Sequence, residues 1–208
     1  MGRLDILEGI DAYIVTHMHP DHFDIEKDKN GNLIGGKHLN KSTKMFVQNA
    51  EDQRFVEASG FTKTEILSES GTMFGDVNLR KTSGIHGTIE PAGTAMGIIM
   101  QAENEKMLYI AGDTIYCKEV ELILLKYRPE VVVANACAAN TSKKGRLIMN
   151  GEDLIKIHQI VPDAVIIASH MEAVNHAMIT RSELKKQMQV AGISEFVVIP
   201  DDGEIYAE

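Results

Sequence analysis

Short apolar runs alternate with amphipathic stretches along the second half of the sequence. The apolar runs predict buried strands at residues 107–111, 131–135, 164–168 and 195–199. The stretches between them have helical spacing and predict helices at residues 118–127, 151–160 and 181–190. Asn150 is a natural cap for the second helix, and Thr180 with Glu183 predicts a capping box at the third. Strands that alternate with helices in this way indicate an α/β fold with layered sheets and helices.

The first part of the sequence has a different pattern of apolar and polar residues. Residues 11–16 form an apolar run bounded by polar residues, which predicts a buried strand. Residues 26–44 are polar and rich in Gly and Asn, so we expect an irregular loop there. A helix is expected over residues 50–59, because Asn49 can cap its N-terminus and Gly60 can end it.

Between residues 62 and 102 the apolar runs are short and broken by glycines, which predicts antiparallel strands. A hairpin is expected to join residues 97–102 to residues 106–110. The sequence contains no internal repeat and no Pro/Ser-rich linker. We therefore expect residues 1–208 to form a single domain.

Composition narrows the class of function. Of the 208 residues, 44% are hydrophobic and 25% are charged, which is typical of a globular chain. The formal net charge of -9 disfavours nucleic acid as a partner, because phosphate binding needs a basic surface. No apolar run reaches the roughly 20 residues of a membrane helix, and a signal-peptide pattern is absent. With Cys117 and Cys137 in apolar settings that suit reduced thiols, we expect a cytoplasmic protein without a membrane partner.

A dense group of metal-ligating residues follows the first predicted strand: His17, His19, Asp21 and His22. Imidazoles and carboxylates are ligands that Zn²⁺ and similar cations prefer. Because the backbone can turn after a strand, His17 and His19 can point one way while Asp21 and His22 point another. The group can therefore supply two adjacent metals. The alternative is a set of surface histidines in an acidic protein.

Three more candidate ligands lie in matching contexts. His86 is flanked by Gly84 and Gly87 in a loop between predicted strands, and Asp113 and His170 each follow a strand. Alone, each is more often a surface, hydrogen-bonded or turn residue. Loops at the carboxyl ends of strands are where sites collect in α/β sheets, so the combination favours a metal site.

The motif HMHPDH, the Gly-flanked His86, Asp113 in a GDT turn and His170 after a late strand together resemble the metallo-β-lactamase superfamily of metal-dependent hydrolases, over about residues 11–203. The resemblance implies a four-layer αββα sandwich with a dinuclear site at one edge of its two sheets. It also implies one metal on His17, His19 and His86, a second on Asp21, His22 and His170, and Asp113 bridging both. The flanking sequence looks most like the branch that includes ascorbate-6-phosphate lactonases.

The implied activity is hydrolysis by a metal-bound hydroxide. Two divalent cations lower the pKa of water from about 15.7 toward about 7 and polarise a carbonyl or phosphoryl oxygen. Asp21 and Asp113 neutralise only part of the charge of two such cations, which favours a small anionic ester, lactone or phosphoester. Zn²⁺ is the expected metal, and Mn²⁺ or Fe²⁺ are alternatives because His/Asp sites accept all three.

Candidate catalytic residues are Asp21 and His176. His176 is expected in the loop before the last helix, as a substrate ligand or proton donor, or otherwise as a surface or capping histidine. Weaker candidates for substrate contact are Tyr116, Lys37 and His38, with solvated surface residues as the alternative. Glu172 is also a candidate, but a solvated side chain or an outer partner of a metal ligand is the favoured interpretation. Three alternative functions remain open: a nuclease of the same fold, a glyoxalase-type thioester hydrolase, and a metal-binding protein without hydrolytic activity, such as a sensor or a decayed enzyme.

The resemblance further implies an N-terminally shortened version of the fold. Members of the superfamily normally place several strands ahead of the HxHxDH motif, whereas residues 1–16 have room for one. A sheet without those strands exposes backbone edges and apolar side chains that need cover. We therefore expect a homo-oligomer that acts on a small-molecule substrate.

Overall fold

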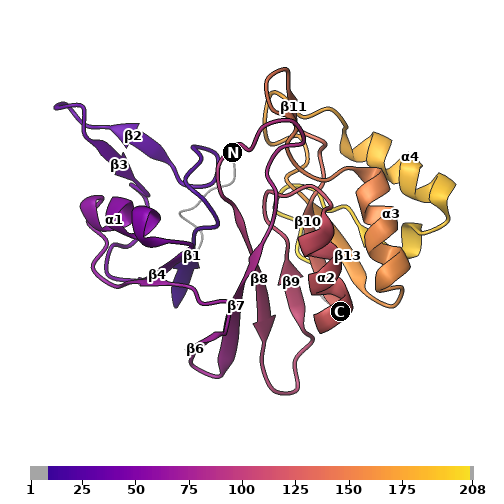
Figure 1. The fold of residues 1–208 in the computed structure, drawn as a ribbon, viewed down its shortest axis with the longest axis horizontal. Helices are drawn as coiled ribbons and strands as arrows, with labels where there is room; N and C mark the ends of the chain where they lie inside the picture. The colour runs from indigo at the N-terminus through magenta and orange to yellow at the C-terminus, as the bar shows by residue number, and fades with distance from the viewer. Residues whose placement is uncertain (1–8, 207–208) are drawn as a thin grey trace. The chain divides into compact units, whose positions relative to one another are not determined.

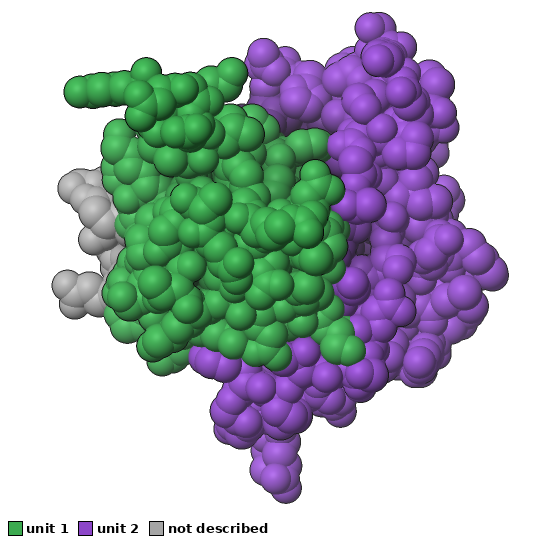
Figure 2. Space-filling model, turned by 60° about the vertical axis from the view of Figure 1, so that its left-hand side comes forward, with its two compact units in different colours: residues 1–68 green, residues 69–208 purple. Residues whose placement is uncertain are grey.

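A computed structural model describes residues 9–206 of the chain (Figure 1). The chain divides into two compact units, Met1–Ser68 and Glu69–Glu208, which Figure 2 colours green and purple. Each unit has a hydrophobic core of its own. The expectation that residues 1–208 form a single domain stays a prediction.

The first unit is built on a three-stranded parallel sheet with the order β1–β4–β5. Its strands are β1 (Ala12–Ile14), β4 (Lys44–Val47) and β5 (Thr64–Ile66). Helix α1 (Ala50–Ala58) connects β4 to β5 and packs against β5. The core of this unit is formed by the buried side chains of Val15, Phe23, Met45, Val47, Val56 and Phe61.

Helix α1 has the ends that the sequence predicts. The side chain of Asn49 accepts hydrogen bonds from the backbone N–H groups of Glu51 and Asp52, which would otherwise lack helical partners. Beyond the helix, Gly60 has a φ of +95° and donates its N–H to the carbonyl of Glu57. Glycine adopts this left-handed conformation without a steric cost. The predicted helix is therefore confirmed to within one residue.

The expectation of an irregular loop over residues 26–44 is wrong. Strands β2 (Ile25–Lys27) and β3 (Leu33–Gly35) form an antiparallel hairpin. Its turn is fixed by the carboxylate of Asp28, which accepts hydrogen bonds from the backbone N–H of Asn30 and from both the backbone and the side chain of Asn32. Strands of three residues are too short for the alternation of polar and apolar residues to reveal them.

Strand β5 also differs from expectation. The sequence predicts an antiparallel strand in this region, whereas β5 pairs in parallel with β4. The reason is the crossover connection: α1 carries the chain back along the sheet, so that the next strand runs in the same direction.

The second unit contains a seven-stranded mixed sheet with the order β14–β13–β10–β9–β8–β7–β6. Antiparallel pairing joins β6 (Thr72–Phe74), β7 (Val77–Ser83), β8 (Met96–Gln101) and β9 (Leu108–Ile110). Parallel pairing joins β9 to β10 (Val131–Asn135), β13 (Val165–Ser169) and β14 (Val197–Val198). A separate two-stranded ladder consists of β11 (Asn140–Thr141) and β12 (Gly145–Arg146). The predicted β8–β9 hairpin is confirmed.

Three helices connect the parallel strands: α2 (Lys118–Tyr127), α3 (Gly151–Ile160) and α4 (Arg181–Ala191). Helix α3 contacts both α2 and α4, and Figure 1 shows the three side by side. The predicted caps are confirmed, since Asn150 accepts from the N–H of Asp153 and Thr180 forms a reciprocal capping box with Glu183. No helix among residues 9–206 combines the length and the apolar character needed to cross a membrane.

The last predicted strand is shorter than expected. Residues 194–196 form a 3₁₀ turn, and β14 is confined to Val197–Val198. The turn is closed by a hydrogen bond from the N–H of Phe196 to the carbonyl of Ile193. Apolar content alone cannot distinguish such a turn from the strand that follows it.

Arg128 allows a test of how the backbone conformation at the end of α2 affects stability. This exposed residue ends α2 in the left-handed conformation, with φ of 46° and ψ of 56°. A residue with a Cβ atom is strained there by about 1–2 kcal/mol, whereas glycine is not, although glycine loses more chain entropy on folding. We expect Arg128→Gly to raise the free energy of unfolding by about 0.5–1 kcal/mol in urea denaturation. Arg128→Ala keeps the Cβ atom and is the control, and an equal gain in both variants would contradict the explanation.

Candidate metal centre

The HxHxDH motif occupies the loop after β1 in the first unit. Nε2 of His17 lies 2.9 Å from Nδ1 of His19. The ring centroid of His17 is 4.4 Å from that of His19 and 4.3 Å from that of His22. Nε2 of His22 is 3.6 Å from a carboxylate oxygen of Asp21, whose side chain is 37% exposed. The four predicted donors of this unit are therefore neighbours.

A tight turn holds this group in place. The carbonyl of His19 accepts hydrogen bonds from the backbone N–H groups of His22 and Phe23, at 3.0 and 2.8 Å. Phe23 is buried in the core of the first unit and anchors the end of the turn. At the other end, the hydroxyl of Thr16 lies 3.1 Å from Nδ1 of His17, a contact that helps fix the orientation of the ring.

The second unit contributes a buried histidine and a buried aspartate. His86 lies between β7 and β8, Asp113 lies after β9, and both are buried. Nδ1 of His86 is 3.0 Å from the backbone carbonyl oxygen of Leu147. A carbonyl can only accept, so the proton of the neutral ring is on Nδ1 and the lone pair is on Nε2. Nε2 lies 3.9 Å from Oδ2 of Asp113, which is longer than a hydrogen bond.

The other carboxylate oxygen of Asp113 has a different neighbour. Nδ2 of Asn135 donates to Oδ1 of Asp113 at 2.6 Å. Asn135 is the last residue of β10, and Gly112 turns the chain just before Asp113 with a φ of +70°. The carboxylate therefore has one oxygen held by an amide, while the other lies 3.9 Å from an imidazole nitrogen.

The two loops that carry His86 and Asp113 are joined to each other. The hydroxyl of Thr114 accepts from the N–H of Ile85 at 2.8 Å, and the N–H of Ile115 donates to the carbonyl of Ile85 at 2.9 Å. Gly84 permits this approach, because a Cβ atom on it would lie 2.7 Å from the side chain of Thr114. The residues next to His86 and Asp113 are thus fixed against each other, Ile85 on one loop and Thr114 with Ile115 on the other.

His170 directly follows β13 and has a φ of +63°, an uncommon conformation for a residue other than glycine. Its Nδ1 lies 3.7 Å from Sγ of the fully buried Cys137. Glu172, two positions further on, is also left-handed with a φ of 58°. Such conformations persist where the surrounding structure fixes them, and they are common at functional sites.

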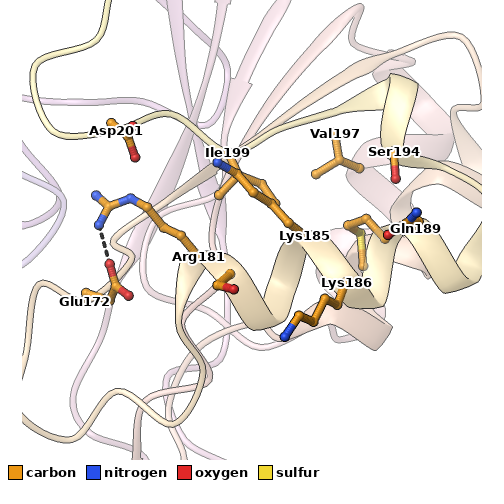
Figure 3. A pocket seen from close by; sticks show the side chains of 11 residues that line it. Glu172, Arg181, Lys185, Lys186, Gln189, Ser194, Val197, Ile199 and Asp201 are labelled. Atoms are coloured by element: carbon orange, nitrogen blue, oxygen red, sulfur yellow. Dashed lines mark hydrogen bonds and ion pairs between the residues drawn. The ribbon is translucent and has the colours of Figure 1, made fainter.

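Arg181 ties this loop to the end of the chain. Its guanidinium donates to Glu172 at 2.6 Å and to the carbonyl of Pro200 at 2.9 Å, and it also pairs with Asp202. Figure 3 shows Arg181 turned toward Glu172 at one end of a cavity of about 920 Å³. Lys185 lines the same cavity, so cationic side chains lie beside the loop of His170.

The weaker candidates have local contacts. Nδ1 of His176 is 3.1 Å from the side-chain oxygen of Asn175, and the ammonium of Lys37 is 3.6 Å from Glu26 in the β2–β3 hairpin. Burial raises the pKa of Tyr116, and nearby carboxylates raise it further, so its phenol stays protonated at neutral pH. Contact of these residues and of His38 with a substrate stays a prediction.

The sequence alone does not single out the residues that contact the predicted metal ligands of the second unit. Asn135, Cys137 and Leu147 all belong to the segment that begins at the end of β10. One signal was available: Asn135 ends the otherwise apolar run VVVAN.

Comparison with known proteins identifies the family. Residues 2–171 match the family described as the β-lactamase superfamily domain. The UPF0173 protein YddR of Bacillus subtilis (strain 168) is 41% identical over 206 residues, which cover 97% of this chain and 78% of that protein. The UPF0173 metal-dependent hydrolase MJ1163 of Methanocaldococcus jannaschii is 26% identical over 205 residues, covering 96% of this chain and 84% of the relative.

Solved structures of similar proteins agree with this family assignment. An isothiocyanate hydrolase from Delia radicum gut bacteria has a TM-score of 0.88 and 32% identity, covering 100% of this chain and 80% of the other. A possible metal-dependent hydrolase from Veillonella parvula DSM 2008 has a TM-score of 0.85 and 34% identity, covering 96% and 77%. The protein is thus a metal-dependent hydrolase with the metallo-β-lactamase fold. The chain belongs to the β-lactamase superfamily domain family, which confirms the resemblance, while the lactonase-like branch stays a prediction.

The cysteines provide a test of the site's chemistry. Burial raises the pKa of the Cys117 thiol, and Cys137 is fully buried. Because the thiolate is the reactive form, we expect iodoacetamide near neutral pH to label both at least about tenfold more slowly in the folded protein than in urea. Labelling of Cys117 should accelerate as the pH rises toward its raised pKa. Rapid labelling of the folded protein, read by mass spectrometry, would instead reveal a reactive thiol.

Proposed function

We propose that the protein is a dinuclear hydrolase of small anionic esters, lactones or phosphoesters. In this proposal one metal is held by His17, His19 and His86, the second by Asp21, His22 and His170, and Asp113 binds both. The observation that carries the proposal is the buried His86–Asp113 pair, in which Nε2 of the imidazole and Oδ2 of the carboxylate lie 3.9 Å apart. A divalent cation would stabilise such a buried pair, because it can bind both the carboxylate oxygen and the imidazole nitrogen.

The donor chemistry of the chain fits such cations. Five imidazoles and two carboxylates are available, with no thiolate among them. This set suits Zn²⁺ first, and Mn²⁺ or Fe²⁺ as alternatives. The contact from Leu147 to His86 is the kind of outer hydrogen bond that fixes the tautomer of a ligating histidine.

When bound, such cations lower the pKa of water toward about 7 and polarise the oxygen of the group under attack. The side chains of the protein hold the donors, orient the substrate and move protons. Asp21 is the most suitable proton acceptor, because its carboxylate is partly exposed and lies beside His22. We assign His176 a role in substrate binding or proton donation. A protein nucleophile is not needed, and burial makes both cysteines poor candidates.

The preference for an anion follows from charge. Two carboxylates against two divalent cations leave a net positive site, which attracts a carboxylate or phosphate group. Lys185 adds a cationic side chain at the cavity beside the His170 loop, whereas the charge of Arg181 is balanced by Glu172 and Asp202. Self-association and a cytoplasmic location stay predictions.

A second candidate is hydrolysis of isothiocyanates. It is favoured by the similarity to the isothiocyanate hydrolase, which extends over this whole chain at 32% identity. The central carbon of an isothiocyanate is an electrophile like a carbonyl carbon, and addition of water followed by C–N cleavage yields an amine and carbonyl sulfide. This substrate class is uncharged, so the two candidates differ in their dependence on substrate charge.

One experiment tests both candidates. We expect elemental analysis of zinc-reconstituted protein to find about two ions per chain. The loaded protein is then assayed with a phosphorylated lactone, phosphate monoesters and diesters, and benzyl isothiocyanate. Chelation should abolish hydrolysis and zinc should restore it, and Asp113→Ala should lower the rate by about a hundredfold or more, since that residue would contact both ions.

Asp163→Ala is the matched control, because Asp163 is exposed and lies outside the proposed site. Preference for the anionic substrates supports the first candidate, and preference for the isothiocyanate supports the second. Binding of less than about half an ion per chain, or activity that survives metal removal, would contradict both.

A further inference from the structure

The three proposed metal ligands of the second unit are His86, Asp113 and His170. One segment, residues 135–147, contacts the side chain of each of them. The pairs are Asn135 with Asp113 at 2.6 Å, Leu147 with His86 at 3.0 Å, and Cys137 with His170 at 3.7 Å. The orientation of all three donors therefore depends on where β10 ends and how the chain continues from it.

We propose that Asn135 is a positioning residue for metal binding, and that it acts by fixing the rotation of the Asp113 carboxylate. The inference rests on the proposed function, because it takes Asp113 as a metal ligand. Of the three supporting contacts, this one is the shortest and comes from a side chain that can be replaced. The contact from Leu147 is made by the backbone, and a thiol such as that of Cys137 is a weak donor.

The geometry favours a role in orientation. The terminal torsion of an aspartate is broad and roughly two-fold, so an unsupported carboxylate samples many rotations. The amide of Asn135 can only donate through Nδ2, and it engages Oδ1 of Asp113. With that bond in place, Oδ2 lies 3.9 Å from Nε2 of His86, close enough for both side chains to contact one cation.

Asn135 is itself held rigidly. It lies opposite Ser169 in the parallel ladder of β10 and β13, and the next N–H, from Ala136, donates to the carbonyl of Ser169 at 3.0 Å. On the other side of β10, the N–H of Ala111 donates to the carbonyl of Val133. The backbone of Asn135, from which the side chain extends, is therefore fixed within the sheet.

The residue type also suits the role. An aspartate at position 135 would have the same length, but it would place a second negative charge against Asp113 and offer no donor at neutral pH. A hydrogen bond from a neutral amide orients the carboxylate and leaves its charge available to a cation. Removal of such outer partners typically weakens metal binding by about 10–100-fold.

The test is zinc affinity of the full chain, measured by competition with a chromogenic chelator. Asn135→Leu keeps a similar side-chain volume but lacks the amide N–H that donates to Asp113. Asn135→Ala has a smaller side chain, and Asn135→Gln retains an amide. The control is Asn140→Ala, because Asn140 is an exposed residue of the same segment. Circular dichroism first establishes which variants are folded at the assay temperature.

We expect the Leu and Ala variants to bind zinc at least about tenfold more weakly, the Gln variant to recover part of that loss, and the control to match the wild type. If Asn135→Leu does not fold, the Ala and Gln variants decide. Wild-type affinity in the folded Leu or Ala variant would overturn the inference, as would equal weakening in all variants including the control. A wild-type protein that binds no zinc would instead show that the proposed function is wrong.

Discussion

Parallel pairing of β9, β10 and β13 is the constraint on which the site of the second unit depends. In this register Asn135 lies opposite Ser169, so β10 and β13 end at the same edge of the sheet, next to the end of β9. Asp113 and His170 follow two of these strands and therefore leave the sheet at that edge. In α/β proteins the carboxyl ends of parallel strands are the usual place for ligands. The aliphatic core beneath α2, α3 and α4 holds the strands in this register.

The chain leaves that edge through sharply turned residues. Gly112, Ala138 and His170 all have positive φ values, of 70°, 54° and 63°. For a residue with a Cβ atom this conformation costs about 1–2 kcal/mol, so it persists only where neighbouring contacts fix it. The first unit achieves a similar rigidity differently, by a turn closed on the carbonyl of His19 and anchored by Phe23. In both units, contacts within the protein fix the loops that carry the predicted metal ligands.

Local signals in the sequence predict much of this structure. The caps Asn49, Asn150 and Thr180 define three helices to within about one residue, and the donors follow strands as expected. Strands β2 and β3 are only three residues long, which is too short for the sequence pattern to predict them. The Asn135–Asp113 contact joins residues 22 positions apart, and the bond from His86 spans 61 positions. Such contacts arise from strand pairing and loop packing, which no local pattern encodes.

The proposed function requires that ligands from both units bind one pair of metal ions. Anomalous diffraction at the zinc edge, from crystals of the zinc-loaded protein, tests it most directly. The account predicts two peaks per chain, each about 2.0–2.2 Å from its ligand atoms. The first peak should contact His17, His19 and His86, the second Asp21, His22 and His170, and both should contact Asp113. Peaks confined to surface carboxylates, or ions bound by residues of one unit alone, would contradict the account.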